Sequence, residues 1–187
     1  LDEDRDGLND EWENRAVQSL RPTLVFHEEE QLLRNPNHKV ALFTRVTPVE
    51  VEENGKTSTY IYFLNAAAYT KDYGSPAFGG IGGHNGDLSN FQMAWKYVDE
   101  HTITLDRLWT SGHVYKKVPE VIGHKRYEIP LDSPEFPNLK FAPDGSLKIY
   151  IEQDKHSTWH SPTWQNQKNG VYSVYSGAEE SPYAQRP

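Results

Sequence analysis

The sequence predicts a mainly β protein, an antiparallel β-sandwich that follows a short N-terminal loop and helix. Three observations support this fold class. Apolar and polar side chains alternate along several short segments, glycine- and proline-rich turns separate these segments, and no second amphipathic helical period follows Pro22. Short alternating strands divided by turns bury one face each, which is typical of two sheets packed face to face.

The predicted strands extend from residue 40 to residue 175. Val40–Val46 and Thr57–Leu64 are rich in β-branched and aromatic residues, and the Asn54-Gly55 pair between them is typical of a tight hairpin turn. The other predicted strands are Phe91–Tyr97, Thr102–Trp109, Lys125–Ile129, Leu147–Gln153 and Val171–Tyr175. In Phe91–Tyr97 and Leu147–Gln153, alternation places the large apolar side chains on one face.

A long connection, Tyr69–Asp87, separates two of the predicted strands. It contains six glycines between residues 74 and 86. Loops of this length inside a compact domain are usually functional or mobile. We therefore expect a site at this loop.

Length and charge limit the classes of protein to consider. The 187 residues suit one domain, and a net charge of −8 argues against a nucleic-acid partner. Without cysteine the chain has no disulfide and no thiolate metal site, and no apolar run is long enough for a transmembrane segment. We expect residues 1–21 to form a loop and helix, 22–176 the β domain, and 177–187 a polar tail. Because the chain starts at Leu1, we expect a processed protein or part of a larger chain.

Residues 2–13 have the spacing of a twelve-residue calcium loop. Acidic residues occupy loop positions 1, 3, 5, 9 and 12, and Gly7 occupies position 6, where a sharp turn is needed. The predicted calcium ligands are the side chains of Asp2, Asp4, Asp6, Asp10 and Glu13 and the backbone carbonyl of Leu8. The alternative is a solvated acidic helix cap without a metal.

The residues around this loop indicate its type. There is no room for a preceding helix, and Trp12–Leu20 can form one short helix that ends before Pro22. The Asp-x-Asp-x-Asp-Gly-Leu-x-Asp pattern resembles the calcium loops of thrombospondin type 3 and dockerin modules. That resemblance implies a structural calcium site in a secreted or cell-surface protein.

Four polar residues near strand ends are candidates for a metal or ligand pocket. They are His84, Asp87, His113 and His156. Strand ends meet at one rim of a sandwich, and imidazole with carboxylate suits zinc, manganese or iron, whereas oxygen-rich surroundings suit calcium or magnesium. The alternative for each histidine is an ordinary surface or partly buried group. We expect a structural role for His27, His38 and His101.

A family resemblance rests on four segments between residues 60 and 160. They are Phe63-Leu-Asn65, Gly83-His-Asn-Gly-Asp87, Ser111-Gly-His113, and Ile149-Tyr-Ile151 with the following Lys155-His-Ser157. This pattern resembles the Vps62-related family. It is distantly similar to the Gly-His-Arg-His-Asp-Trp-Glu heptapeptide of necrosis- and ethylene-inducing-like proteins, which are secreted β-sandwich cytolysins. The resemblance implies a divalent metal in an acidic pocket that engages the sugar headgroups of sphingolipids.

The resemblance assigns motif positions to His84, Asp87, His113 and His156. One motif position differs, because the family's glutamate two residues after the motif aspartate is Ser89 here. This difference removes a metal ligand or acid–base group. The chain also has none of the cytolysins' cysteines.

Three functions are consistent with these features. The first is a secreted calcium-binding module that binds a glycan or lipid headgroup at the His/Asp-lined rim, with aromatic faces for a sugar ring. The second is a metal-dependent hydrolase or lyase acting on a polysaccharide or phosphodiester, with His156 and Asp154 as candidate catalytic residues. The third is a structural surface domain without a pocket. The aromatic residues that could provide faces for a sugar ring in the first function are Tyr69, Tyr73, Trp109, Trp159 and Trp164.

Overall fold

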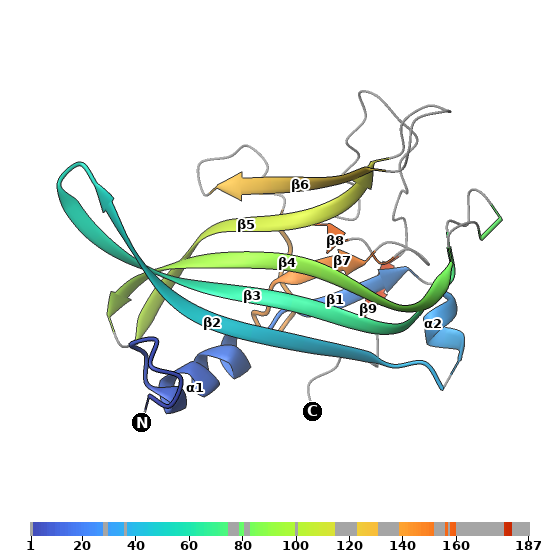
Figure 1. Cartoon of the computed structure of the whole chain (residues 1–187), viewed down its shortest axis with the longest axis horizontal. Coiled ribbons are helices and arrows are strands. Elements are labelled where there is room, and N and C mark those ends of the chain that lie inside the picture. Colours follow the sequence, from blue (N-terminus) through green and yellow to red (C-terminus); the bar gives the residue numbers. More distant parts are fainter. Residues whose placement is uncertain are drawn as a thin grey trace.

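The computed structural model describes most of the chain and is mainly β (Figure 1). The described residues are 2–27, 30–35, 37–74, 79–80, 83–99, 101–114, 123–130, 139–151, 156, 158–159 and 178–180. Within them, nine strands and two helices form, so the predicted mainly β fold class is confirmed. No helix in this part of the chain is long and apolar enough to span a membrane.

Helix α1, Asp10–Leu20, follows the acidic loop as predicted. The Asn9 side chain caps it, because its oxygen accepts hydrogen bonds from the amides of Glu11 at 3.0 Å and Trp12 at 3.3 Å. Acidic residues in the first turn also interact favourably with the helix dipole. The helix ends before Pro22, which cannot continue the helical hydrogen-bond pattern.

The larger sheet is an antiparallel meander with the strand order β2-β3-β4-β5-β6. Its strands are β2 Val40–Glu53, β3 Lys56–Asp72, β4 His84–Asp99, β5 Thr102–Val114 and β6 Gly123–Pro130. Each strand pairs with the next one along the chain. The five strands predicted between residues 40 and 129 are all present. Each is longer than predicted, because backbone pairing continues beyond the alternating apolar residues.

The turn between β2 and β3 is the predicted one. Asn54 and Gly55 have φ angles of +53° and +73°, as the two central residues of a type I′ turn require. Asparagine tolerates this left-handed conformation, and glycine adopts it without a steric penalty. The turn sets the register of the hairpin, which continues to Val40 opposite Tyr69.

The smaller sheet collects segments from both ends of the chain in the order β8-β7-β1-β9. Its strands are β1 Thr23–His27, β7 Lys148–Ile151, β8 Thr158–Trp159 and β9 Ala178–Glu180. β1 runs parallel to β7, whereas β8 and β9 pair antiparallel with β7 and β1. The strand predicted from Leu147 is thus present as β7. The strand predicted at Val171–Tyr175 lies outside the described residues.

Four elements of the structure, β1, α2, β8 and β9, are not among the predicted ones, and β8 has only two residues. β1 is a short apolar run, and α2, Gln31–Arg34, is too short for a helical period to show in the sequence. β9 lies in the segment expected to be a polar tail. Its pairing with β1 is made by backbone groups, so it needs no alternating apolar pattern.

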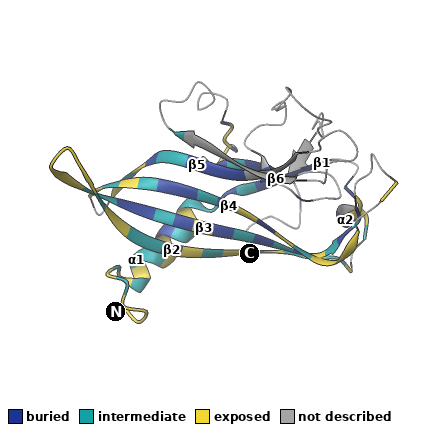
Figure 2. Cartoon of the chain, turned by 45° about the horizontal axis from the view of Figure 1, so that its top comes forward, coloured by how far each residue is buried: buried dark blue, intermediate teal, exposed yellow. Residues whose placement is uncertain are grey.

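One hydrophobic core is shared by the two sheets. Phe26 of β1 and Ile149 of β7 belong to the same buried cluster as Phe63 of β3 and Met93 of β4. The smaller sheet lies behind the larger one in the view of Figure 1. Figure 2 shows that burial is greatest in the middle of β3, β4 and β5, and that the β2–β3 hairpin end is exposed. Helix α1 adds Ala16 to the cluster.

The glycine-rich connection is shorter than predicted. β3 continues to Asp72 and β4 begins at His84, so the connection covers residues 73–83, and His84 and Asp87 lie in a strand instead of a loop. Pairing continues because backbone hydrogen bonds do not require apolar side chains. The connection folds back on itself closely at Gly74, which has a φ of +82°. A Cβ atom there would lie 2.1 Å from the Gly80 carbonyl oxygen, so glycine is required.

Candidate functional site

Five carboxylates converge in the N-terminal loop. Carboxylate oxygens of Asp2, Asp4 and Asp6 lie within 4.8 Å of one another, and so do those of Asp4, Asp10 and Glu13. Asp4 belongs to both groups, so the five predicted side-chain ligands form one cluster. Burial, and after it the negative charges of the four aspartates, raise the pKa of Glu13, as crowded like charges do.

The backbone of the loop is wrapped around these carboxylates. Gly7 has a φ of +98°, and the Asp2 carboxylate accepts hydrogen bonds from the amides of Asp6 at 3.2 Å and Gly7 at 3.1 Å. Leu8, the predicted carbonyl ligand, donates its amide to Asp6 Oδ1 at 2.9 Å. The other oxygen of this carboxylate, Asp6 Oδ2, is buried without a hydrogen-bond donor among the described residues. A buried anionic oxygen of this kind is a suitable cation ligand.

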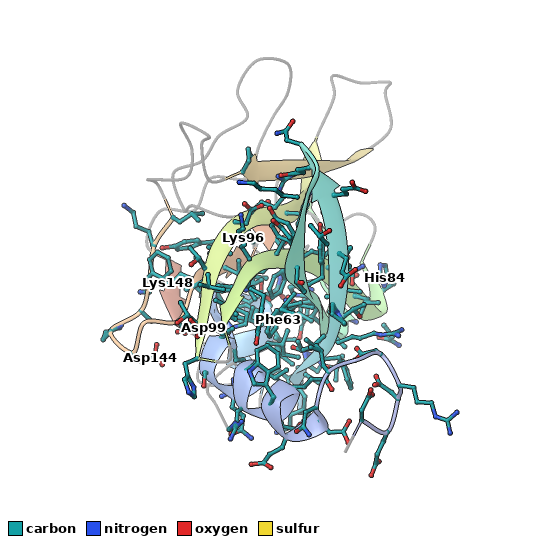
Figure 3. All side chains as sticks on the ribbon, turned by 90° about the vertical axis from the view of Figure 1, so that its left-hand side faces the viewer. Phe63, His84, Lys96, Asp99, Asp144 and Lys148 are labelled. Atoms are coloured by element: carbon teal, nitrogen blue, oxygen red, sulfur yellow. The ribbon has the colours of Figure 1, made fainter. Side chains whose placement is uncertain are left out.

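A second group of possible ligands lies where β3 ends and β4 begins. Asp72 pairs with His84 across the two strands, and Asp87 pairs with Tyr69. The ligand atoms of Asp72, His84 and Asp87 lie within 4.8 Å of one another, and we call these three residues the rim cluster. In Figure 1 this end of β3 and β4 lies beside α2, and Figure 3 shows His84 at the edge of the molecule.

Hydrogen bonds to the backbone orient the His84 ring and the Asp72 carboxylate of the rim cluster. His84 Nδ1 lies 2.6 Å from the Gly86 carbonyl oxygen, which can only accept, so a neutral His84 carries its proton on Nδ1. The lone pair then lies on Nε2, 3.5 Å from Asp72 Oδ2. Asp72 is itself held by the Gly74 amide, which donates to Oδ1 at 2.5 Å. The arrangement is that of a metal-binding imidazole oriented by a backbone carbonyl.

Behind the rim cluster, His156 is completely buried between two carboxylates. Its Nδ1 lies 3.2 Å from Asp87 Oδ2, and its Nε2 lies 3.4 Å from Glu30 Oε1. Asp87 therefore belongs to both the rim cluster and this buried group. We call Glu30, His156 and Asp87 the buried triad.

The ring and backbone of His156 are fixed by further contacts. The ring stacks on Tyr69 at 4.0 Å between centroids and 14° between planes. Ser89 donates a short hydrogen bond to the His156 carbonyl oxygen. His156 also has a φ of +55°, a conformation that non-glycine residues rarely adopt. A strained residue held by several contacts is typical of functional sites.

The electrostatics of the buried triad favour its charged form. Burial alone would lower the pKa of His156, but the hydrogen bonds and charges of Asp87 and Glu30 outweigh burial and raise this pKa to about 9. Burial opposes ionisation of Asp87 as well, but the His156 and Leu88 hydrogen bonds keep its pKa below the usual value. His156 is therefore an imidazolium at neutral pH.

Tyr69 is affected by the same charges. Burial, and then the charges of Asp87 and Glu30, raise its pKa well above the usual value, while the nearby Ser89 hydroxyl opposes this rise. The Tyr69 hydroxyl is buried and completes no hydrogen bond with a described group. Tyr69 is thus neutral, and its ring acts as a support for His156.

The raised pKa of His156 predicts that the metal-free protein loses stability at alkaline pH. The folded-state pKa of about 9 exceeds the usual 6.5, so the stabilisation is complete below pH 6.5 and is lost as pH rises through 9. The difference corresponds to about 3 kcal/mol in the free energy of unfolding. Urea denaturation with chelator at several pH values measures it. A loss equally steep in His156→Asn would show that another group titrates.

The structure brings together three of the four predicted pocket residues, His84, Asp87 and His156. The fourth, His113, lies in β5 in register with His124 of β6, and its side chain is outside the described part of the structure. The candidate catalytic residue Asp154 also lies outside it. The pocket role of His113 and the catalytic role of Asp154 therefore stay predictions.

The expectation that loop aromatics present sugar-binding faces is wrong for two residues. Tyr69 lies in β3 and Trp109 in β5, and their exposed fractions are only 3% and 8%. Tyr73 lies in the 73–83 connection, where its hydroxyl makes a short hydrogen bond with His38. Trp159 belongs to β8, but its side chain is not described, and Trp164 lies outside the described residues.

Two important residues were not among the predicted ones. Asp72 completes the rim cluster, and Glu30 completes the buried triad. The only sequence signal for Asp72 is its position at the end of an apolar run, directly before the glycine-rich connection. Glu30 ends a run of three glutamates, which by itself indicates only a solvated segment.

Comparison with known proteins adds no assignment. No family model matches the sequence, and no curated protein or solved structure matches it.

Proposed function

We propose that this chain is a secreted, calcium-binding β-sandwich module that binds a glycan or lipid headgroup through a divalent cation at the rim cluster. The observation that carries the proposal is that the ligand atoms of Asp72, His84 and Asp87 lie within 4.8 Å of one another. The resemblance to the Vps62-related family supports it, because His84 and Asp87 occupy motif positions of a metal pocket.

The donor set of the rim cluster suits a divalent cation with open coordination positions. Two carboxylates and one imidazole are a mixed oxygen and nitrogen set, which favours zinc, manganese or iron over calcium. Three protein ligands leave positions for the oxygens of a hydroxyl or phosphate group. The His84 side chain is 55% exposed, so these positions can be reached from solvent.

The charges of the two clusters support the same proposal. Glu30, Asp72 and Asp87 carry three negative charges, and the His156 imidazolium carries one positive charge. Glu30, Asp72 and His156 are buried. A divalent cation at the rim would interact favourably with the carboxylates of Asp72 and Asp87.

The N-terminal loop is proposed as a separate, structural calcium site. Its ligands are all oxygens, which calcium prefers, and Asp6 Oδ2 has no other described partner. Asp10 and Glu13 belong to α1, so calcium would join the loop to the helix. Millimolar extracellular calcium would fill even a weak loop of this kind.

The geometry gives less support to an enzyme. His156 was the candidate general base, but a buried imidazolium with both nitrogens engaged has no free lone pair to accept a proton. We therefore propose binding without hydrolysis. A purely structural domain is the outcome if neither a rim cation nor a ligand is found.

The expected result is a rim cation that is needed for ligand binding. Metal content is measured on protein purified without chelator, for wild type, Asp4→Ala/Asp6→Ala and His84→Ala. The loop variant should lose calcium only, and His84→Ala should lose the second metal. The same proteins are tested on a glycan array and on phosphatidylcholine vesicles with and without a glycosylated sphingolipid, where His84→Ala should bind at least about tenfold more weakly.

His101→Ala is the matched control, because His101 is exposed and lies at the β4–β5 turn, away from the rim cluster. It should bind as wild type does. If His84→Ala and chelator-treated protein bind the array and vesicles as strongly as wild type does, the rim cluster is not the binding site.

A further inference from the structure

The buried triad connects α2 to the rim cluster through a continuous line of contacts. Glu30 Oε1 accepts the Leu32 amide at 2.9 Å, so the first turn of α2 holds this carboxylate. The same oxygen faces His156 Nε2 at 3.4 Å, and His156 Nδ1 faces Asp87 Oδ2 at 3.2 Å. The side chains of Glu30 and His156 have no exposed surface.

Asp87 is held in a way that leaves acceptor capacity for a cation. Its Oδ1 accepts the Leu88 amide at 2.8 Å, and its Oδ2 faces His156. Each carboxylate oxygen has two lone pairs, so one on each oxygen remains. The same carboxylate lies within reach of Asp72 and His84. The direction of the remaining lone pairs therefore depends on the position of the His156 ring.

The position of that ring depends in turn on Glu30. Stacking on Tyr69 fixes the plane of the ring, but a rotation by half a turn about the Cβ–Cγ bond keeps this plane and exchanges the positions of the nitrogens and ring carbons. The contacts at the two nitrogens fix this rotation, and Glu30 provides the one at Nε2. Without it, the buried Nε2–H would lose this acceptor, and the ring would be expected to turn toward another one.

We propose that Glu30 is a positioning residue for the rim cluster, which acts through His156 to orient the Asp87 carboxylate toward the cation. The inference rests on the proposed function, because it requires a cation at Asp72, His84 and Asp87. Residues outside the coordination sphere that orient ligands typically change metal affinity by 10- to 100-fold.

The test is a double-mutant cycle with Mn²⁺ as the probe. The full chain carries Asp4→Asn and Asp6→Asn, so that the N-terminal loop does not contribute, and Mn²⁺ affinity is measured by calorimetry. Glu30→Ala should weaken binding by at least about tenfold. Glu30→Gln should restore affinity to within about threefold of the parent chain, because its oxygen can still accept from Leu32 and His156.

The second arm of the cycle uses His156→Asn. Asparagine tolerates the positive φ, and its amide can replace Nδ1 opposite Asp87 but cannot reach Glu30. In this background Glu30→Ala should change Mn²⁺ affinity by less than about twofold, since the connection is already broken. A merely structural role of Glu30 would reduce affinity to the same extent in both backgrounds, which would overturn the inference.

Two controls separate the inference from the proposed function. Glu50→Ala, an exposed carboxylate of β2, should leave Mn²⁺ affinity unchanged. If Mn²⁺ binding is lost in His84→Ala but unchanged in Glu30→Ala, the rim site stands and the role of Glu30 does not. If the parent chain binds no Mn²⁺, or His84→Ala binds it equally well, the proposed function fails and the inference fails with it.

Discussion

His156→Leu is expected to lower the free energy of unfolding by about 3 to 5 kcal/mol. The replacement leaves Glu30 and Asp87 on either side of an apolar side chain, with no cation between them. The buried Glu30 carboxylate and the partly buried Asp87 carboxylate would each lose the cation that offsets much of the cost of their desolvation. Urea denaturation with chelator at neutral pH measures the loss.

The cause can be separated from simple loss of packing. In a Glu30→Gln/Asp87→Asn background the neighbours of residue 156 carry no charge. His156→Leu should there cost about 2 kcal/mol less than in the native chain, because neither neighbour of residue 156 then loses a cationic partner. Equal losses in the two backgrounds would show that stacking on Tyr69, and not charge, holds His156 in place.

Chelation of calcium is expected to lower the melting temperature by about 5 to 10 °C. If free calcium exceeds the dissociation constant about 100-fold, binding stabilises the folded chain by about 2.7 kcal/mol, and a chain of this size shifts by about 2 to 4 °C per kcal/mol. The effect reaches the core because Asp10 and Glu13 lie in α1, which packs through Ala16 and Trp12. Thermal denaturation with calcium or chelator measures it.

The variant Asp4→Ala/Asp6→Ala is the control for this shift. After removal of the rim cation, it should melt at the same temperature with and without added calcium. Near-ultraviolet circular dichroism should also change on chelation, since Trp12 packs edge to face against Tyr97 at 6.4 Å. An unchanged melting temperature in wild type would show that the loop is only a solvated acidic cap.

Much of the larger sheet could be predicted because its signals are local. Alternation over Phe91–Tyr97 identifies β4, and Asn54-Gly55 identifies the hairpin turn, each within a few residues. The N-terminal carboxylates are likewise close in sequence, so their spacing alone brings them together.

The buried triad and the smaller sheet depend on contacts between distant parts of the chain. Glu30 and His156 are 126 residues apart, and no local pattern links them. Because both residues lie near predicted strand ends, the sequence correctly predicted that Asp87 and His156 lie close together. It did not predict that His156 is buried. Burial follows from its position between α2 and β4, which depends on the pairing of β1 with β7.

The topology of the two sheets implies an order in which the binding region can form during synthesis. Every pairing of the larger sheet joins neighbouring strands, so the rim cluster is complete once β4 has left the ribosome. The smaller sheet pairs β1 with a strand more than 120 residues later, and His156 follows that strand. Domains fold from the N-terminus as they emerge, and distant pairings form slowly. A nascent chain would therefore bring Asp72, His84 and Asp87 together well before the histidine that contacts Asp87.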